Sequence, residues 1–183
     1  MTEPLFIEFA NSALYDGHGN LEDLLLDDSW CSSFLKKWGM AKLGPLDKAT
    51  RAELTELRST IRSIAERLRV GRTPARKDLA NLNAALAASP VQFQLSELDE
   101  RFELGTVPLA ATRAAALIGE IALSMARFLA GPDIDRLKMC DNAGCRWVFH
   151  DDTKNLSRKW CRSCGNLDKV RRFRERQALA NRE

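Results

Sequence analysis

The amino-acid sequence predicts a mainly α-helical protein: a helical N-terminal domain that contains one short β-hairpin, followed by a small cysteine-rich module. Three observations predict this class. Apolar residues recur at three- and four-residue steps through most of residues 1–131, whereas one segment within them alternates with a period of two. Four of the five cysteines gather in the last third of the chain. Because the tripeptide "GPD" at 131–133 breaks the helical pattern, we divide the chain into residues 1–131 and 132–183.

Length and composition fit an ordinary globular protein. The chain has 183 residues, of which 45% are hydrophobic and 29% charged, so general disorder is not expected. Its first residues include Glu3 and Glu8, where a secretory signal needs positive charge and an unbroken apolar core. The most apolar stretch, 108–131, is interrupted by charged residues and lacks the roughly 20 uncharged residues of a bilayer span. We therefore expect a cytoplasmic protein with no membrane partner.

Two segments of the N-terminal domain carry both the spacing and the end signals of amphipathic helices. The first begins at Asp27 or Asp28 as N-cap and ends at Gly39. The second has Asp47 as its N-cap and stops at Gly71. Their apolar residues recur every three or four positions: Trp30, Phe34, Trp38, Leu54, Leu57, Ile61, Ile64, Ala65 and Leu68.

A third amphipathic helix is predicted directly after the second. Thr73 stands where an N-cap is expected, and Pro74 occupies the first helical position, which tolerates proline because its N–H has no helical partner. Leu79, Leu82 and Leu86 then fall on one face, which we expect to be buried.

The period of the pattern changes in the segment from Pro90 to Thr106. Val91, Phe93 and Leu95 alternate with polar residues, and a charged turn follows before the next apolar residues. This alternation predicts a short, half-exposed β-hairpin. After it, the apolar stretch from Pro108 to Ala130 predicts a long buried helix.

Four cysteines form the pattern C-x4-C, fifteen residues, C-x2-C: Cys140, Cys145, Cys161 and Cys164. Thiols in a chain without a secretory signal stay reduced, so metal explains the cluster better than disulfides. Two short loops can each present two sulfurs to one tetrahedral Zn²⁺. We therefore predict one structural zinc, because four thiolates leave no open position for catalysis. The alternatives are a metal-free buried set and a catalytic zinc site.

The sequence between and after the cysteine pairs predicts a treble-clef-like finger. Residues 146–150 favour a strand, 151–155 a turn, and 157–160 a returning strand. Beyond Cys164 the chain can enter a helix, with Asn166 as its N-cap.

Positive charge is concentrated in this module. Residues 1–135 hold 15 Lys and Arg against 19 Asp and Glu, whereas residues 136–183 hold 13 against 6. On the predicted helix, Leu167, Val170 and Phe173 would face the core of the finger, with basic residues on both flanks. Such a surface suits phosphate contacts; the alternatives are a solvated helix face and a surface for an acidic protein. The predicted nucleic-acid contacts are Arg158, Lys159, Arg162, Asn166, Lys169, Arg171, Arg172, Arg174 and Arg176.

Other chemically reactive residues have simpler explanations. His18 lies in a glycine-flanked turn, His150 could only supplement a complete thiolate site, and Cys31 fits a small core position. The sequence contains none of the common motifs for phosphate loops, zinc proteases or serine hydrolases. We therefore predict that the protein is not an enzyme.

These motifs resemble a known domain pair. The run "C-x4-C-R-W-x-F … S-R-K-W-C … C-G-N … K-V-R-R-F-R" is similar to the CGNR zinc finger of bacterial proteins. The segments "FANS", "DLLLDD…FLKKWG" and the helix leading into "RLKMC" look like the ABATE domain that precedes this finger. Two departures stand out: Leu167 replaces the arginine of the signature, and the second cysteine pair is closer than the x4 spacing of the family.

The resemblance implies a stress-induced transcription regulator with a DNA-binding finger. We accordingly predict a zinc-finger regulator that presents its basic helix to DNA, with the N-terminal domain available for a small-molecule effector or a homodimer contact. The alternative is a zinc-stabilised adapter whose basic helix binds an acidic protein partner.

Overall fold

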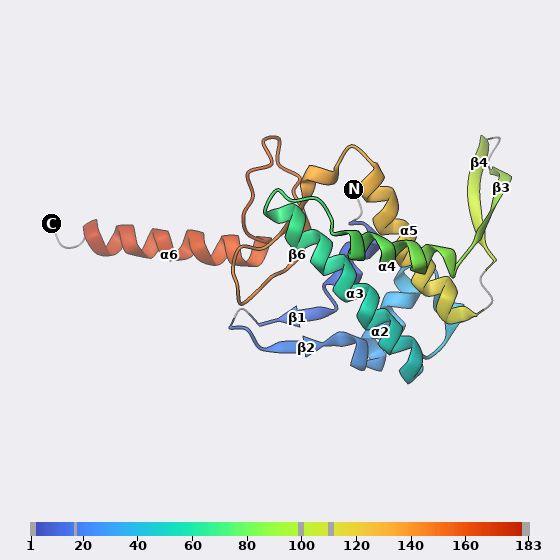
Figure 1. Ribbon diagram of the computed structural model, residues 1–183. Helices are drawn as coiled ribbons and strands as arrows, with labels where there is room; N and C mark the ends of the chain where they lie inside the picture. Colours follow the sequence, from blue (N-terminus) through green and yellow to red (C-terminus); the bar gives the residue numbers. More distant parts are fainter. Residues whose placement is uncertain (1–2, 17, 99–100, 110–111, 181–183) are drawn as a thin grey trace.

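The computed structural model describes residues 3–16, 18–98, 101–109 and 112–180, and its fold is mainly α-helical, as predicted. Figure 1 shows a body of helices from which a β-hairpin and the C-terminal helix project at opposite ends. The helices are α1 (Leu5–Ala10), α2 (Asp28–Lys37), α3 (Lys48–Arg69), α4 (Arg76–Ala87), α5 (Arg113–Ala130) and α6 (Arg162–Ala180). The strands are β1 (Ala13–Tyr15), β2 (Leu21–Asp23), β3 (Val91–Leu98), β4 (Arg101–Pro108), β5 (Leu137–Met139) and β6 (Val148–His150). Within the described ranges, none of the helices combines the length and the apolar character that a membrane crossing needs.

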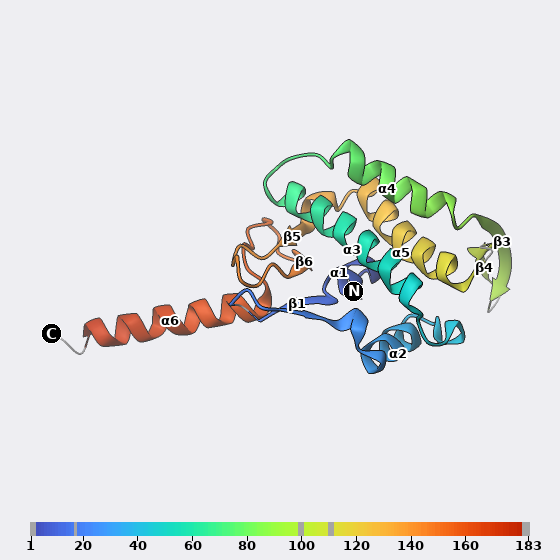
Figure 2. The same cartoon turned by 60° about the horizontal axis from the view of Figure 1, so that its bottom comes forward.

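The main core lies where α1, α3, α4 and α5 pack together. Figure 2 shows α3, α4 and α5 running side by side, with α1 beneath them. Phe6 and Phe9 of α1 are fully buried, and the centre of the Phe6 ring lies 5.2 Å from the centre of the Phe128 ring on α5. Each large side chain buried in this way contributes roughly 1.5–3 kcal/mol to folding. The short α1, which the spacing analysis does not predict, is therefore a central element of the core.

Three predicted helix ends are confirmed. The Asp27 side chain accepts a hydrogen bond from Ser29 N (2.8 Å), and the Asp47 side chain accepts one from Thr50 N (2.7 Å). Gly71 has φ +70°, and the next amide, that of Arg72, donates to the carbonyl of Arg67 (2.9 Å). A side chain with a Cβ rarely adopts that backbone conformation, so glycine ends α3 here.

The predicted starts of the next two long helices are wrong. Thr73 does not cap α4, because Ala75 is the N-cap residue and the Thr73 carbonyl instead accepts a hydrogen bond from Arg67 Nε (2.7 Å). Leu79 is exposed rather than buried with Leu82. The long apolar helix begins only at Arg113, after Thr112 caps it through Ala115 N (3.0 Å), because the chain up to residue 108 continues as β4.

The predicted hairpin near residue 91 is present, but it is longer and more exposed than expected. β3 and β4 pair antiparallel over eight residues each, from Val91 opposite Pro108 to Leu98 opposite Arg101. Its large apolar side chains are exposed on both strands. In Figure 1 the hairpin stands clear of the helical body.

A second hairpin joins the cysteine-rich region to the main core. β5 pairs with β6 from Leu137 opposite His150 to Met139 opposite Val148, and three of these side chains are fully buried in the core that α1, α3 and α5 also form. The prediction that 157–160 returns as a strand is wrong. The strand that pairs with 148–150 lies before the first cysteine instead of after the turn.

Candidate metal centre

The two cysteine pairs lie on different elements. Cys140 follows β5, and Cys145 lies in the turn that leads to β6. Asn142 shapes this turn, since its side chain accepts from Gly144 N (3.0 Å) and its carbonyl accepts from Cys145 N (2.9 Å). Arg146 then takes a left-handed backbone conformation, φ +50°, which turns the chain into β6. The first pair is therefore presented by the tip of a hairpin whose strands are buried in the core.

The second cysteine pair begins α6. The Cys161 carbonyl accepts a hydrogen bond from Gly165 N (2.9 Å), which is the i to i−4 bond of a helix, so α6 starts at Arg162. The prediction of Asn166 as N-cap is therefore wrong, because Asn166 lies inside the first turns. Cys164 occupies the third helical position, where the free N–H groups favour negative charge. The arrangement of a hairpin knuckle followed by a helix that carries the second pair confirms a zinc-finger module.

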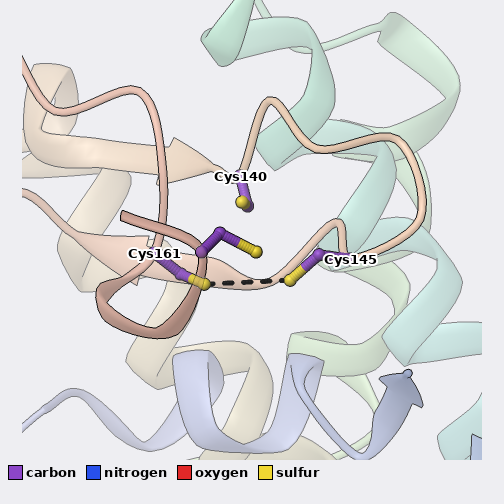
Figure 3. Close-up of side chains that lie close together, drawn as sticks. Cys140, Cys145 and Cys161 are labelled. Carbon is purple, nitrogen blue, oxygen red and sulfur yellow. Dashed lines mark hydrogen bonds between the residues drawn. The ribbon is translucent and has the colours of Figure 1, made fainter. Parts of the chain in front are cut away.

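The four sulfurs converge on one point. The Sγ atoms of Cys140, Cys145, Cys161 and Cys164 all lie within 4.8 Å of one another, and those of Cys145 and Cys161 are 3.8 Å apart. Figure 3 shows the labelled side chains pointing toward one another from the two knuckles. A tetrahedral Zn²⁺ at about 2.3 Å from each sulfur would separate the sulfurs by about 3.8 Å. The donor set and its spacing thus fit one structural zinc, which would supply a fixed cross-link.

The thiols have unequal acidities in the surroundings that the protein itself provides. Burial raises the pKa of the Cys140 thiol to about 11, and burial also raises the pKa of Cys145. Burial acts in the same direction on Cys164, but hydrogen bonds from Asn142 and the neighbouring thiols outweigh it and lower the pKa of Cys164. The Asn142 amide lies 3.4 Å from Cys164 Sγ. A bound divalent cation would hold all four groups as thiolates.

A buried aspartate organises the loop between the two knuckles. Asp151 is fully buried, and its carboxylate accepts from Thr153 N (3.0 Å), Thr153 Oγ1 (2.6 Å) and Arg158 N (3.0 Å). Burial alone would raise the pKa of this carboxyl. The hydrogen bonds from Thr153 and Arg158 outweigh burial and lower the pKa. The sequence marks the segment as a turn but does not identify Asp151 as its anchor.

The finger is also tied to the helical body by polar contacts that the sequence analysis missed. The buried Asn11 side chain donates to the Val148 carbonyl (2.8 Å) and accepts from Val148 N (2.9 Å), so it pairs with β6 as a neighbouring strand would. Arg62 donates to the carbonyls of Ala10 and Arg146, both at 3.0 Å. A signal for Asn11 existed in the segment "FANS", but nothing local indicated its partner.

The predicted nucleic-acid contacts occupy different surroundings. Lys159, Arg162, Asn166, Lys169, Arg171 and Arg174 are exposed. Arg158 is half-buried, with its guanidinium 4.7 Å from the centre of the Phe149 ring and 3.1 Å from Asp152 Oδ1. Arg171 pairs with Asp168 at 3.0 Å. The side chains of Arg172 and Arg176 lie outside the described part of the structure.

The predicted packing of α6 is wrong. Leu167, Val170 and Phe173 do not face the core of the finger, because all three side chains are exposed. In both Figure 1 and Figure 2, α6 leaves the metal centre and extends away from the rest of the molecule. The finger closes its own small core with Phe149 and the cysteines, with Trp147 and Trp160 packed against them.

The other residues considered from sequence have structural roles or lie at the surface. Cys31 is buried on α2, and Trp30 stacks on Phe34 with ring centres 5.0 Å apart, as expected for core residues. His18 is exposed in its turn. His150 lies edge-on to Phe128 at 6.1 Å between ring centres.

A cleft of about 1280 Å³ lies between the finger and the antiparallel hairpin that β1 and β2 form. Tyr15 and His18 line one part of it, whereas His150, Arg162 and Leu167 line another. A molecule bound in this cleft would contact both regions of the chain.

The fold and the thiolate cluster together define a zinc-finger protein built on a helical N-terminal domain. The sequence belongs to the ABATE family, whose description reads "Putative stress-induced transcription regulator", and the match covers residues 3–132. Residues 136–177 match the CGNR zinc finger. The predicted resemblance is therefore confirmed for both parts. No curated protein matches the chain.

Proposed function

We propose that the protein is a DNA-binding transcription regulator in which one structural zinc ion fixes the start of α6 and presents this helix to the phosphate backbone. One observation carries the proposal: α6 projects freely from the metal centre (Figure 1) and holds six Lys and Arg against two Asp and Glu in residues 162–180. Each cationic side chain that neutralises a phosphate releases counterions, so a clustered row gives substantial affinity. The family description of a regulator supports the same reading.

The dimensions of α6 suit a nucleic-acid groove. Its 19 residues span about 28 Å at 1.5 Å per residue, and a B-DNA major groove admits one α-helix. Lys169, Arg171 and Arg174 are exposed along it, while Lys159 and Arg162 extend the charge to the second knuckle. We propose that these residues, together with Asn166, Arg172 and Arg176, contact DNA. Arg158 stacks on Phe149 and pairs with Asp152, so we assign it a structural role in place of the predicted DNA contact.

A charge-removal series tests this proposal. The triple variant Arg171→Ala, Arg172→Ala and Arg174→Ala retains helix-forming residues but removes three charges. Binding to a random duplex should weaken, and the slope of log affinity against log salt should fall by about 2–3, since each lost phosphate contact removes about 0.9. Fluorescence anisotropy over a salt series measures both quantities.

A matched control removes equal charge from the helical body. Arg72, Arg76 and Lys77 are exposed near the start of α4, and changing all three to Ala should leave the salt slope as in the unmodified protein. Equal loss in the two triple variants would indicate non-specific attraction and contradict a role for α6. Unchanged binding in the α6 variant would do so as well.

A second candidate function is that of an adapter whose α6 binds an acidic protein. The exposed seam of Leu167, Val170 and Phe173 between basic residues favours it, because an amphipathic helix of this kind can dock in an apolar groove with an acidic rim. The double variant Leu167→Ser and Phe173→Ser separates the two functions. A regulator should keep most of its duplex affinity in this variant, whereas an adapter should show little duplex binding at physiological salt with or without the change.

A small-molecule effector and a cytoplasmic, bacterial setting stay predictions; the cleft beside Tyr15 offers space for such a ligand. Neither family description names a reaction, and we propose no enzymatic activity.

A further inference from the structure

The β3–β4 hairpin has one apolar and one polar face. Residues directly opposite in an antiparallel pair share a face, so the register places Phe93 with Thr106, Leu95 with Leu104, and Glu97 with Phe102 on one side. The other side carries mainly polar residues: Gln92, Gln94, Ser96, Arg101 and Glu103, with Leu98 and Val107.

The apolar face has no cover from its own chain in the described structure. Phe93 is 69% exposed, Leu95 64%, Phe102 74% and Leu104 66%. A two-stranded hairpin by itself is marginally stable in water and needs packing on one face. Within the described residues, both outer strand edges are also unpaired, since β3 and β4 form a two-stranded sheet. These features are typical of a surface that another chain covers.

We propose that this apolar face, centred on Phe93, Leu95, Phe102 and Leu104, is where two copies of the chain pair around a two-fold axis. A two-fold contact uses the same patch on both copies, and an apolar patch can pair with a second copy of itself because apolar attraction has no direction. The proposal goes beyond DNA binding and does not depend on it.

The area of the face is sufficient for a pair. At roughly 150–200 Å² for each large apolar side chain, four side chains exposed by about two-thirds offer about 400–550 Å². Two copies would therefore bury about 800–1,100 Å² in total, a range that includes the roughly 1,000 Å² at which specific interfaces begin.

The charges of the hairpin bear on which partner can cover the apolar face and on how two hairpins would be oriented in a pair. Residues 91–108 contain four acidic residues and one arginine, which disfavours an anionic membrane or nucleic acid as the occupant. Among the described residues of the apolar face, the charged one is Glu97, which lies next to the turn. Antiparallel packing of two hairpins places the two Glu97 carboxylates at opposite ends of the interface, whereas parallel packing would bring them together.

The position of the hairpin makes such a pair compatible with a free α6. The hairpin and α6 lie at opposite ends of the molecule in Figure 1 and Figure 2. In a pair joined through the hairpins, both copies of α6 point outward and stay accessible.

Sedimentation equilibrium over a concentration series tests the pair. The full chain with zinc should approach twice its 20.6 kDa mass as concentration rises. The double variant Phe93→Ser and Phe102→Ser should raise the dissociation constant by about 30-fold or more, because large apolar anchors dominate such interfaces. Its matched control, Leu98→Ser and Val107→Ser, removes apolar side chains from the opposite face and should pair as the unmodified chain does.

Three outcomes would overturn the proposal. They are a chain that stays monomeric throughout, equal weakening by the two double variants, and a mass that grows beyond two copies, as head-to-tail joining of the acidic hairpin to basic α6 would produce. Hydrogen exchange of the unmodified chain gives an independent check. Amides of residues 91–98 should become more protected as concentration rises, and protection that is independent of concentration would also reject the pair.

Discussion

The β5–β6 and β3–β4 hairpins have the same local design and opposite surroundings. Both are antiparallel, and β5, like β3, alternates apolar with polar residues. In β5–β6, Leu137, Met139 and Val148 are fully buried, whereas the apolar residues of β3–β4 are exposed. Alternation therefore determines which face of a hairpin is apolar, but the cover comes from elsewhere. For β5–β6 the cover consists of helices distant in the sequence, and the cysteine site completes it at the tip.

Removing the metal should have the largest effect, and of the two hairpins only β5–β6 should be affected. Structural zinc contributes on the order of 10 kcal/mol in small zinc-binding modules, so chelation under reducing conditions should unfold residues 140–164 and release the start of α6. Residues 91–108 should be unaffected. Hydrogen exchange with and without a chelator measures both regions in one experiment.

Controls for the metal experiment come from the fifth cysteine. The variant Cys161→Ser should lower bound zinc below one ion per chain, whereas Cys31→Ala, in a buried thiol of α2 outside the cluster, should not change the zinc content. Full retention of exchange protection around Cys145 after chelation would contradict a structural role for the metal.

Shortening a side chain of the covered hairpin should have the next largest effect. Met139→Ala removes a fully buried side chain from the shared core and should lower the free energy of unfolding by about 2–5 kcal/mol. The matching change Leu95→Ala on β3 should cost less than about 0.5 kcal/mol in the monomer. Urea unfolding followed by tryptophan fluorescence compares the two. Equal losses would mean that β3–β4 packs on its own chain.

Local sequence predicted those features that depend on near neighbours. The caps Asp27 and Asp47 bond amides two or three residues ahead, and each cysteine pair spans a single short turn, so spacing alone identifies them. The strand partner of 148–150 and the bridge from Asn11 to Val148, which joins residues 137 positions apart, depend on the folded core. The exposed face of α6 differs from the prediction for the same reason. Spacing indicates an apolar seam on this helix, but no local signal specifies whether another element packs against that seam.

A surface ion pair between α3 and the cysteine-rich region should contribute little to the free energy of unfolding. Asp141, next to the first cysteine, pairs with Arg69 at 2.8 Å, and both side chains are about one-third exposed. The hydrogen bonds that Arg69 donates to Glu66 and Asp141 raise the pKa of Arg69, yet Glu66 would still pair with Arg69 after Asp141→Asn. We expect a loss of 1 kcal/mol or less, which should shrink further in 1 M salt as screening increases. A larger loss that persists in salt would point to an effect of Asp141 on the knuckle itself.

The smallest effect on the monomer should come from Phe102→Ser, and its concentration dependence sharpens the comparison most. Because Phe102 is exposed in the folded monomer, its loss should change the free energy of unfolding by less than about 0.5 kcal/mol at high dilution. At higher concentration the unmodified chain should gain stability from pairing by mass action, and the variant should not. Urea unfolding at two chain concentrations separates the stability of the monomer from the stability gained by pairing. A loss of several kcal/mol at high dilution would show that the hairpin already has cover within its own chain, as β5–β6 does.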